Sequence, residues 1–158
     1  MGPDVTLFTQ YRDTVKPEWI DANNYMNVAC FVLTFDLASD AFLTEIGSGA
    51  DYIKEQGKSF FIVEMNVSYK QEMCKGAPLF YNTQLIGLAA NKIHLFHRMY
   101  HEVEGYLAAT NEILLLHVNM ATRRSISMGK SIYKALSLIS GKHKEIALPD
   151  NLLRQLKV

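Results

Sequence analysis

The densest group of polar side chains that could do chemistry lies between Trp19 and Asn27, directly before a long apolar segment. The start of a helix exposes unpaired backbone N–H groups at the positive end of the helix dipole, and these can polarise a carbonyl or hold an oxyanion. A carboxylate a few residues earlier, such as Asp21, could activate water or attack the carbonyl directly. The alternative is that Asp21 or Asn23 only caps the helix, which is a common role for both residue types.

Three histidines, His94, His97 and His101, form a second candidate group. Spacings of three and four would place them on one side of a helix, as in a metal site. Their neighbours Ile93 and Leu95 instead follow the alternation of a strand, on which His94 and His97 face opposite ways. The sequence therefore predicts no metal site.

A long helix is predicted from Tyr25 to Ile46, where it would place its first turn beside the polar group. Apolar residues recur on one face at spacings of three and four, namely Val28, Phe31, Phe35, Ala38, Phe42 and Ile46. Leu33 and Leu37 lie off that face, so we expect the helix to be buried on more than one side. Gly47 ends it, and residues 50–56 are predicted to add one or two helical turns.

Strands are predicted for most of the remaining chain. Alternating apolar residues indicate a first strand near residues 5–11. Four longer β-like runs follow, with short turns between the last three, at residues 59–70, 78–90, 92–103 and 106–119. This pattern predicts antiparallel hairpins. Helices are predicted at 128–139 and 149–156. The fold class is therefore α+β, a curved five-stranded antiparallel sheet around one long buried helix with short C-terminal helices.

The charge balance excludes binding to nucleic acid or to a membrane through bulk charge. The 158 residues carry 16 basic and 16 acidic side chains. The sequence has no secretory signal and no run of ~18 apolar residues, so we expect a cytoplasmic protein with Cys30 and Cys74 reduced. The length fits a single domain over 1–158. Its core is expected at about residues 5–122, before a tail over 123–158 with eight basic and two acidic side chains.

The stretch from Pro17 to Val28 resembles the helix-entry motif of hotdog-fold acyl-CoA thioesterases, the 4-hydroxybenzoyl-CoA thioesterase-like group. In that motif, Asp-x-x-Gly-His-x-Asn precedes a long helix and an antiparallel sheet. Residues 35–40, 92–97 and 107–112 extend the likeness to the betainyl-CoA thioesterases of carnitine breakdown. The resemblance spans about residues 8–125. It implies a hotdog fold and hydrolysis of a small acyl-CoA thioester without a cofactor, with betainyl-CoA as one expected substrate.

Carried onto this sequence, the resemblance makes Asp21 the catalytic residue, acting as nucleophile or as general base toward water. Asn27 matches the motif's Asn, and its side chain would orient the turn or touch the thioester. The motif's Gly falls at Asn24, which tolerates a positive φ better than most residues. Its His falls at Tyr25, which can form hydrogen bonds but cannot carry a proton at neutral pH as His can. Tyr25, Asn27 and Asn23 are therefore expected to bind substrate.

Carboxylates elsewhere have two interpretations each. Asp36 and Asp40 share a stripe opposite the apolar helix face, and we interpret them as polar-surface residues, although some hotdog thioesterases take their carboxylate from within the helix. Glu64, with Asn66 in register, lies on the polar side of an apolar strand. The resemblance makes Glu64 a substrate-binding residue near a subunit interface, and a structural cross-strand role is the alternative.

The expected activity is hydrolysis of an acyl-CoA to the free acid and coenzyme A, in a homodimer or a dimer of dimers with the active site between subunits. Arg123, Arg124 and the basic tail could contact the phosphates of coenzyme A or serve only solubility. One alternative is a thioesterase for acyl carrier protein, which would dock on the tail. The other is a non-catalytic module that binds an acyl ligand.

Overall fold

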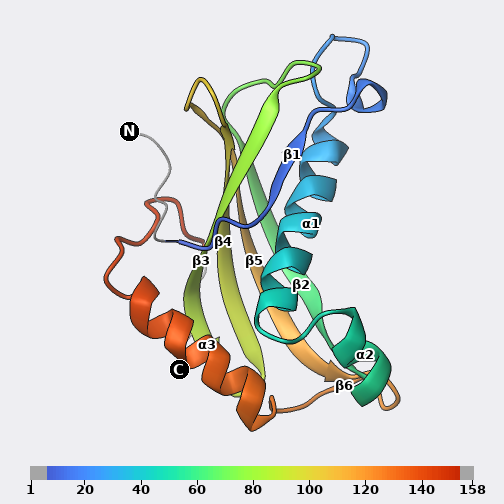
Figure 1. Ribbon diagram of the computed structural model, residues 1–158, viewed down its shortest axis with the longest axis vertical. Coiled ribbons are helices and arrows are strands. Elements are labelled where there is room, and N and C mark those ends of the chain that lie inside the picture. Colours follow the sequence, from blue (N-terminus) through green and yellow to red (C-terminus); the bar gives the residue numbers. More distant parts are fainter. Residues whose placement is uncertain (1–6, 154–158) are drawn as a thin grey trace.

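The structure is a computed structural model and describes residues 7–153. One antiparallel sheet dominates it (Figure 1). The strand order in this part of the chain is β1 (Arg12–Thr14), β3 (Pro78–Ala89), β4 (Lys92–His101), β5 (Leu107–Asn119) and β2 (Lys58–Tyr69), and the short β6 (Arg124–Ser125) also pairs with β5. The predicted hairpins are confirmed because β3, β4 and β5 are neighbours in both sequence and space.

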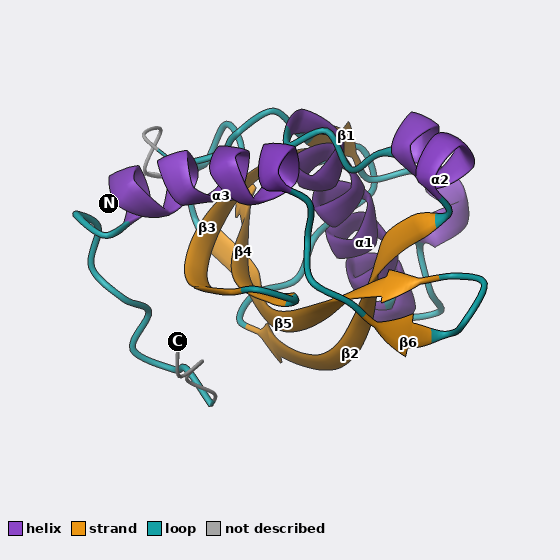
Figure 2. Cartoon of the chain, turned by 90° about the horizontal axis from the view of Figure 1, so that it is seen from below, coloured by secondary structure: helices purple, strands orange, loops and turns teal. Residues whose placement is uncertain are grey.

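Helix α1 (Val28–Glu45) lies in the concave face of the curved sheet (Figure 2). Its core face carries Phe35, Ala38 and Phe42, each 0% exposed, as the spacing predicts. The helix begins three residues later than predicted because Asn27 is its N-cap. Val28, at the start of this face, is 60% exposed. The expectation that the helix is buried on more than one side is wrong at Leu33, which lies off the core face and is 45% exposed among the described residues.

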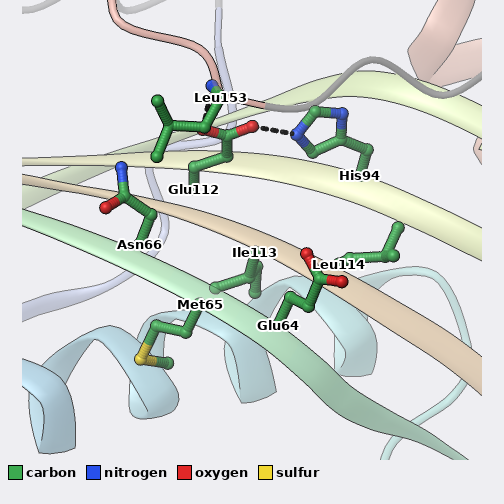
Figure 3. Close-up of a pocket in the computed structure, with 8 residues that line it drawn as sticks. All are labelled: Glu64, Met65, Asn66, His94, Glu112, Ile113, Leu114 and Leu153. Carbon is green, nitrogen blue, oxygen red and sulfur yellow. Dashed lines mark hydrogen bonds and ion pairs between the residues drawn. The ribbon is translucent and has the colours of Figure 1, made fainter.

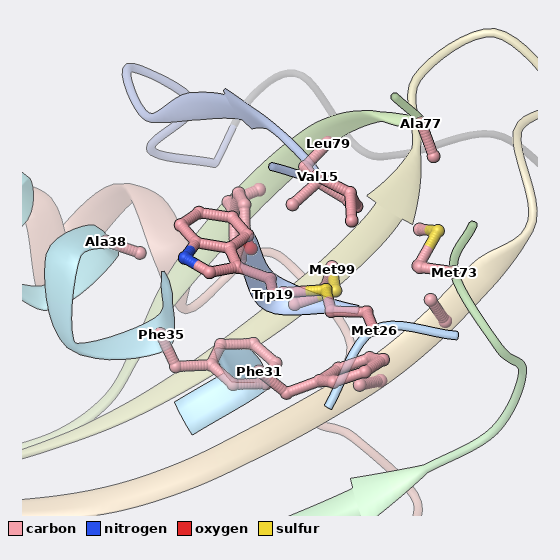
Figure 4. Close-up of a cluster of buried hydrophobic side chains, with 13 residues drawn as sticks. Val15, Trp19, Met26, Phe31, Phe35, Ala38, Met73, Ala77, Leu79 and Met99 are labelled. Carbon is pink, nitrogen blue, oxygen red and sulfur yellow. The ribbon is translucent and has the colours of Figure 1, made fainter. Parts of the chain in front are cut away.

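The core divides into two clusters along α1. Trp19, Met26, Phe31 and Phe35 belong to the cluster at the start of the helix (Figure 4). The second cluster, near the end of the helix, includes side chains of α3 (Lys130–His143), namely Ile132 and Leu136. Helix α3 therefore packs onto the core, although it begins inside the predicted basic tail. The fold matches the hotdog arrangement expected from the sequence, a curved antiparallel sheet around a long helix.

A β-bulge at Val63 interrupts the alternation of β2. Phe60 and Ile62 pack into the core on one side of the bulge, and Met65 lies on that same face beyond it. The sequence alternates Phe61, Val63, Met65, Val67 and Tyr69 with polar residues, which predicts one apolar face; this is wrong at Phe61, which pairs with Leu116 on the convex face. A bulge inserts one residue and reverses the side to which later residues point.

Two elements of the structure differ from the sequence prediction, the first strand and the last helix. The strand near residues 5–11 is reduced to an isolated bridge between Phe8 and Thr83, and β1 starts at Arg12; residues 5 and 6 lie outside the described part. Leu7 is buried as the alternation predicts, but its neighbour Phe8 also packs on Phe42, so the strict alternation of a strand does not hold here.

The C-terminal helix predicted at 149–156 is a turn and coil over 149–153, and its remainder lies outside the described residues. Residues 146–153 instead run along the convex face of the sheet. Gln84 Nε2 donates to the Ala147 carbonyl at 3.2 Å, and the Leu153 amide donates to Glu112 Oε2 at 2.9 Å. These polar contacts from sheet side chains hold the segment in an extended form rather than a helical one.

Helix α2 (Ala50–Gln56) follows α1 as predicted and ends at Gly57, which adopts the left-handed conformation with φ 61°. None of the helices in the described residues has the length and apolar character needed to span a membrane.

Candidate functional site

The loop before α1 is a tight turn around Asp21. The Asp21 amide donates to the Tyr25 carbonyl at 2.9 Å, and the Asn24 amide donates to the Asp21 carbonyl at 3.1 Å. Asn24 has φ 66°, in the left-handed region that favours glycine. The expectation that Asn24 would permit this turn is therefore confirmed.

This turn is fixed to the body of the protein from both sides. The Met26 amide donates to the Met73 carbonyl, and the Asn27 amide donates to the Trp19 carbonyl, both at 2.8 Å. Trp19, Met26 and Met73 are all buried. Asp21 thus stands on a loop whose ends are held by backbone hydrogen bonds and apolar packing.

The helix cap is Asn27, and neither Asp21 nor Asn23 takes that role. Asn27 Oδ1 accepts from the Ala29 amide at 2.8 Å. Asp21 Oδ1 accepts from the Asn23 amide at 2.8 Å, within the turn itself. Asp21 Oδ2 makes no hydrogen bond in the described part of the chain, so one carboxylate oxygen stays available to a ligand.

A cleft of about 500 Å³ opens beside this turn, within the size range of small-molecule sites. We call it the entry cleft. It is lined by Asp21, Asn23, Tyr25, Met26, Val28, Phe31, Tyr69, Lys70, Gln71 and Glu72. The structure thus brings together three of the predicted site residues, Asp21, Asn23 and Tyr25, while Asn27 serves as the cap below them.

The sequence analysis missed the far wall of the entry cleft, formed by residues 69–72 after β2. Tyr69 packs against Phe31 with ring centroids 5.2 Å apart, and its hydroxyl donates to the Val28 carbonyl at 3.1 Å. Partial burial raises the pKa of Tyr69. The alternation of apolar residues along β2 could have identified Tyr69, because it puts this side chain on the helix side of the sheet.

Glu64 lies in a different cleft, on the convex face of the sheet (Figure 3). This cleft of about 360 Å³ also contains Asn66, His94 and Glu112. His94 Nε2 and Glu112 Oε1 are 2.9 Å apart, and both side chains are buried. Within one chain, therefore, the structure does not bring Glu64 together with Asp21.

His97 lies on the opposite side of the sheet from His94, as expected for a strand. It is fully buried against α1, where its Nε2 is 2.8 Å from Ser39 Oγ and its Nδ1 is 2.7 Å from Thr83 Oγ1. Burial lowers the pKa of His97 to about 3. Among residues 7–153, no three His, Cys, Asp or Glu side chains gather as a metal site would require.

The basic segment lies away from the entry cleft. Arg124 begins β6, and α3 follows it, at the end of the sheet opposite the loop that precedes α1 (Figure 1). Arg123 and Arg124 are exposed there. A contact of Arg123 or Arg124 with a ligand in the entry cleft would therefore have to come from a second chain.

Known proteins resemble this chain over nearly its whole length. Residues 15–155 match the family model of the thioesterase-like superfamily. A betainyl-CoA thioesterase of Pseudomonas aeruginosa is 28% identical over 94% of this chain and 93% of its own length. A bifunctional L-carnitine dehydrogenase/betainyl-CoA thioesterase of Ruegeria pomeroyi is 34% identical over 86% of this chain, which spans only 27% of that protein.

Among solved structures, a Staphylococcus aureus protein in complex with CoA superposes with a TM-score of 0.87. It is 26% identical, and the match covers 96% of this chain and 95% of that one.

Proposed function

This chain belongs to the thioesterase-like superfamily and is a thioester hydrolase, and we propose that it hydrolyses a small acyl-CoA in the entry cleft. The observation that carries the proposal is the placement of Asp21. Its carboxylate stands in a turn fixed by backbone hydrogen bonds, beside the first turn of α1, with Oδ2 available in the described structure. Betainyl-CoA is the proposed substrate because relatives of this chain are betainyl-CoA thioesterases.

The proposed reaction needs one carboxylate and one N–H donor. As general base, Asp21 takes a proton from water while the water oxygen bonds to the thioester carbon. The C–S bond then breaks, and the coenzyme A thiolate takes up a proton, which gives the free acid and coenzyme A. As nucleophile, Asp21 would form a mixed anhydride that water then hydrolyses.

The N–H donor is proposed to come from the start of α1. The Ala29 and Cys30 amides donate to Asn27 Oδ1 and to the Asn27 carbonyl. The Val28 amide makes no hydrogen bond within residues 7–153, and Val28 lines the entry cleft. As the first amide of the helix, it is suited to stabilise the oxyanion that forms on the thioester oxygen.

Roles for the other predicted site residues follow from where they lie. Tyr25 and Asn23 line the entry cleft and are proposed to contact the acyl group or the thioester. Asn27 is proposed to act through the helix, since its side chain holds the first turn in place. Glu64 stays a prediction, and it could contribute only where a partner subunit brings the two clefts together.

We also propose that the enzyme is a homodimer. Strand β2 is an edge of the sheet with 12 residues, and Val63, Met65 and Tyr69 on it are 47%, 37% and 48% exposed. A long edge strand with apolar side chains is a site for pairing with another chain. Leu33 on α1 is 45% exposed as well, and a partner chain would also remove this apolar side chain from water.

The experiment that tests the proposal is thiol release from a panel of acyl-CoAs by Asp21→Asn. Asn keeps an oxygen for the Asn23 amide, so the turn should persist, but it cannot take a proton. We expect kcat/KM to fall at least ~100-fold, in line with the loss of a general base. Asp36→Asn, on an exposed helix position, is the control and should retain activity. Full turnover by Asp21→Asn would exclude this mechanism.

A further inference from the structure

The chemistry of a betainyl thioester restricts where its cation can be recognised. The quaternary nitrogen is separated from the reacting carbonyl carbon by a single methylene group. Any group that binds the trimethylammonium end must therefore lie in the same cleft as Asp21. The entry cleft supplies three aromatic rings there, from Tyr25, Phe31 and Tyr69.

The three rings have different exposures, which gives the cleft a base and open walls. Phe31 is 4% exposed and lies at the base, while Tyr25 and Tyr69 are 40% and 48% exposed. The planes of Phe31 and Tyr69 are 77° apart. Rings in two nearly perpendicular planes can meet a round cation from two directions, and a quaternary ammonium is attracted to ring faces without needing a hydrogen-bond acceptor.

Charges in the wall favour a cation. Asp21 and Glu72 are acidic and Lys70 is basic, so the titratable side chains of the wall other than tyrosine sum to one negative charge. The Tyr69 hydroxyl donates to the Val28 carbonyl, which fixes the ring against the start of α1. The site would thus meet the cation with oriented rings and a surplus of negative charge.

We propose that Tyr25, Phe31 and Tyr69 form a subsite that selects acyl groups ending in a quaternary ammonium. The proposal rests on hydrolysis at Asp21 and adds the residues that determine acyl specificity. A neutral tert-butyl end of equal shape would fill the same space but gain no attraction from the ring faces.

The test compares trimethylammonioacetyl-CoA with 3,3-dimethylbutanoyl-CoA, in which carbon replaces the charged nitrogen. The adjacent ammonium makes the thioester carbonyl intrinsically more reactive, so the ratio of kcat/KM values is divided by the ratio of the uncatalysed hydrolysis rates. We expect this corrected ratio to favour the charged substrate about tenfold in the native protein, the size of a partly desolvated cation–π contact. Tyr69→Leu and Tyr25→Leu should bring the ratio toward one. Tyr69→Phe and Tyr25→Phe should keep it, because the ring remains. A corrected ratio of one in the native protein, or an unchanged ratio in the Leu variants, would overturn the subsite.

Two charge variants test the wall independently of the rings. Glu72→Gln should lower the preference for the charged substrate about twofold, and Lys70→Gln should raise it by a similar factor, the scale of exposed charge interactions. Both side chains are exposed, so we expect both variants to fold. Shifts in the same direction would contradict the charge argument.

A binding experiment separates this inference from the proposed function, because it needs no turnover. Calorimetry measures the binding of tetramethylammonium, and tert-butanol is the neutral control. If no acyl-CoA releases thiol, the proposed function fails, yet the subsite is still supported by tetramethylammonium binding that weakens in Tyr69→Leu. Absence of binding, or equal binding by Tyr69→Leu, would overturn the subsite even in an enzyme whose activity depends on Asp21.

Discussion

His97 is a fully buried histidine whose two ring nitrogens both have hydroxyl partners. Ser39 Oγ donates to the Phe35 carbonyl at 3.1 Å, so His97 Nε2–H donates to Ser39 and Nδ1 accepts from Thr83. This arrangement satisfies the neutral ring. A second proton on Nδ1 would face the Thr83 oxygen and would add a charge in the apolar core.

The lowered pKa of His97, about 3, predicts a loss of stability in acid. The unfolded chain binds a proton near pH 6.5 and the folded chain does not, so the free energy of unfolding falls as pH drops below 6.5 and levels off near pH 3. Between pH 6 and pH 4 we expect His97 to lower the free energy of unfolding by about 2–3 kcal/mol. Urea unfolding at both pH values measures the change.

His97→Gln should flatten this pH dependence, while His101→Gln, at a partly exposed position at the end of β4, should not. Where His97→Gln does not fold, the NMR shift of the His97 ring in the native protein supplies the measurement. It should stay that of neutral imidazole down to pH 4. A midpoint near pH 6.5 would contradict the prediction.

The turn at residues 20–27 is the element that places Asp21, and its form depends on Asn24. The positive φ of 66° costs a β-branched residue about 1–2 kcal/mol and costs glycine almost nothing. Asn24→Gly should therefore keep stability and thiol release. Asn24→Val should lower the free energy of unfolding by about 1–2 kcal/mol and reduce kcat, because Asp21 loses its position.

Urea unfolding of Asn24→Gly and Asn24→Val measures the cost of backbone strain, and thiol release by the same variants measures the effect on the reaction. Arg123, with φ 60° in the β5–β6 turn, gives a matched control. Arg123→Val should carry a similar stability cost and leave the turn around Asp21 unchanged, since it lies at the other end of the sheet, so it calibrates the cost of the strain alone. Equal stability of Asn24→Val and Asn24→Gly would show that the turn changes shape to relieve the strain.

For the whole molecule, the exposed edge strand β2 predicts a dimer with a mass of about twice 17.9 kDa, measurable by sedimentation equilibrium. Met65→Lys places a charge on the edge strand and should shift the protein toward monomer. If the partner subunit completes the entry cleft, thiol release should fall as the fraction of dimer falls.

Val103→Lys is the matched control, because Val103 is 80% exposed in the turn between β4 and β5. It should leave the mass and the thiol release unchanged. A native protein that sediments as a monomer at micromolar concentration would exclude the proposed pairing of β2.

The sequence by itself determined helix α1, the hairpins and the turn around Asp21, because each depends on neighbouring residues. Spacings of three and four defined the core face of α1, and short turns defined the hairpins of β3, β4 and β5. The motif around Asp21 indicated a left-handed residue at Asn24, and the structure has one there. The family follows from these local patterns.

Tertiary structure decided which distant residues share a cleft. Tyr69 and Glu72 are 48 and 51 residues from Asp21, and only the packing of β2 beside the start of α1 brings them together. Glu64 faces the convex side with Asn66, in a cleft that the C-terminal segment helps to line. The bulge at Val63 and the cross-strand register set these positions, and both depend on contacts between strands that no local pattern encodes.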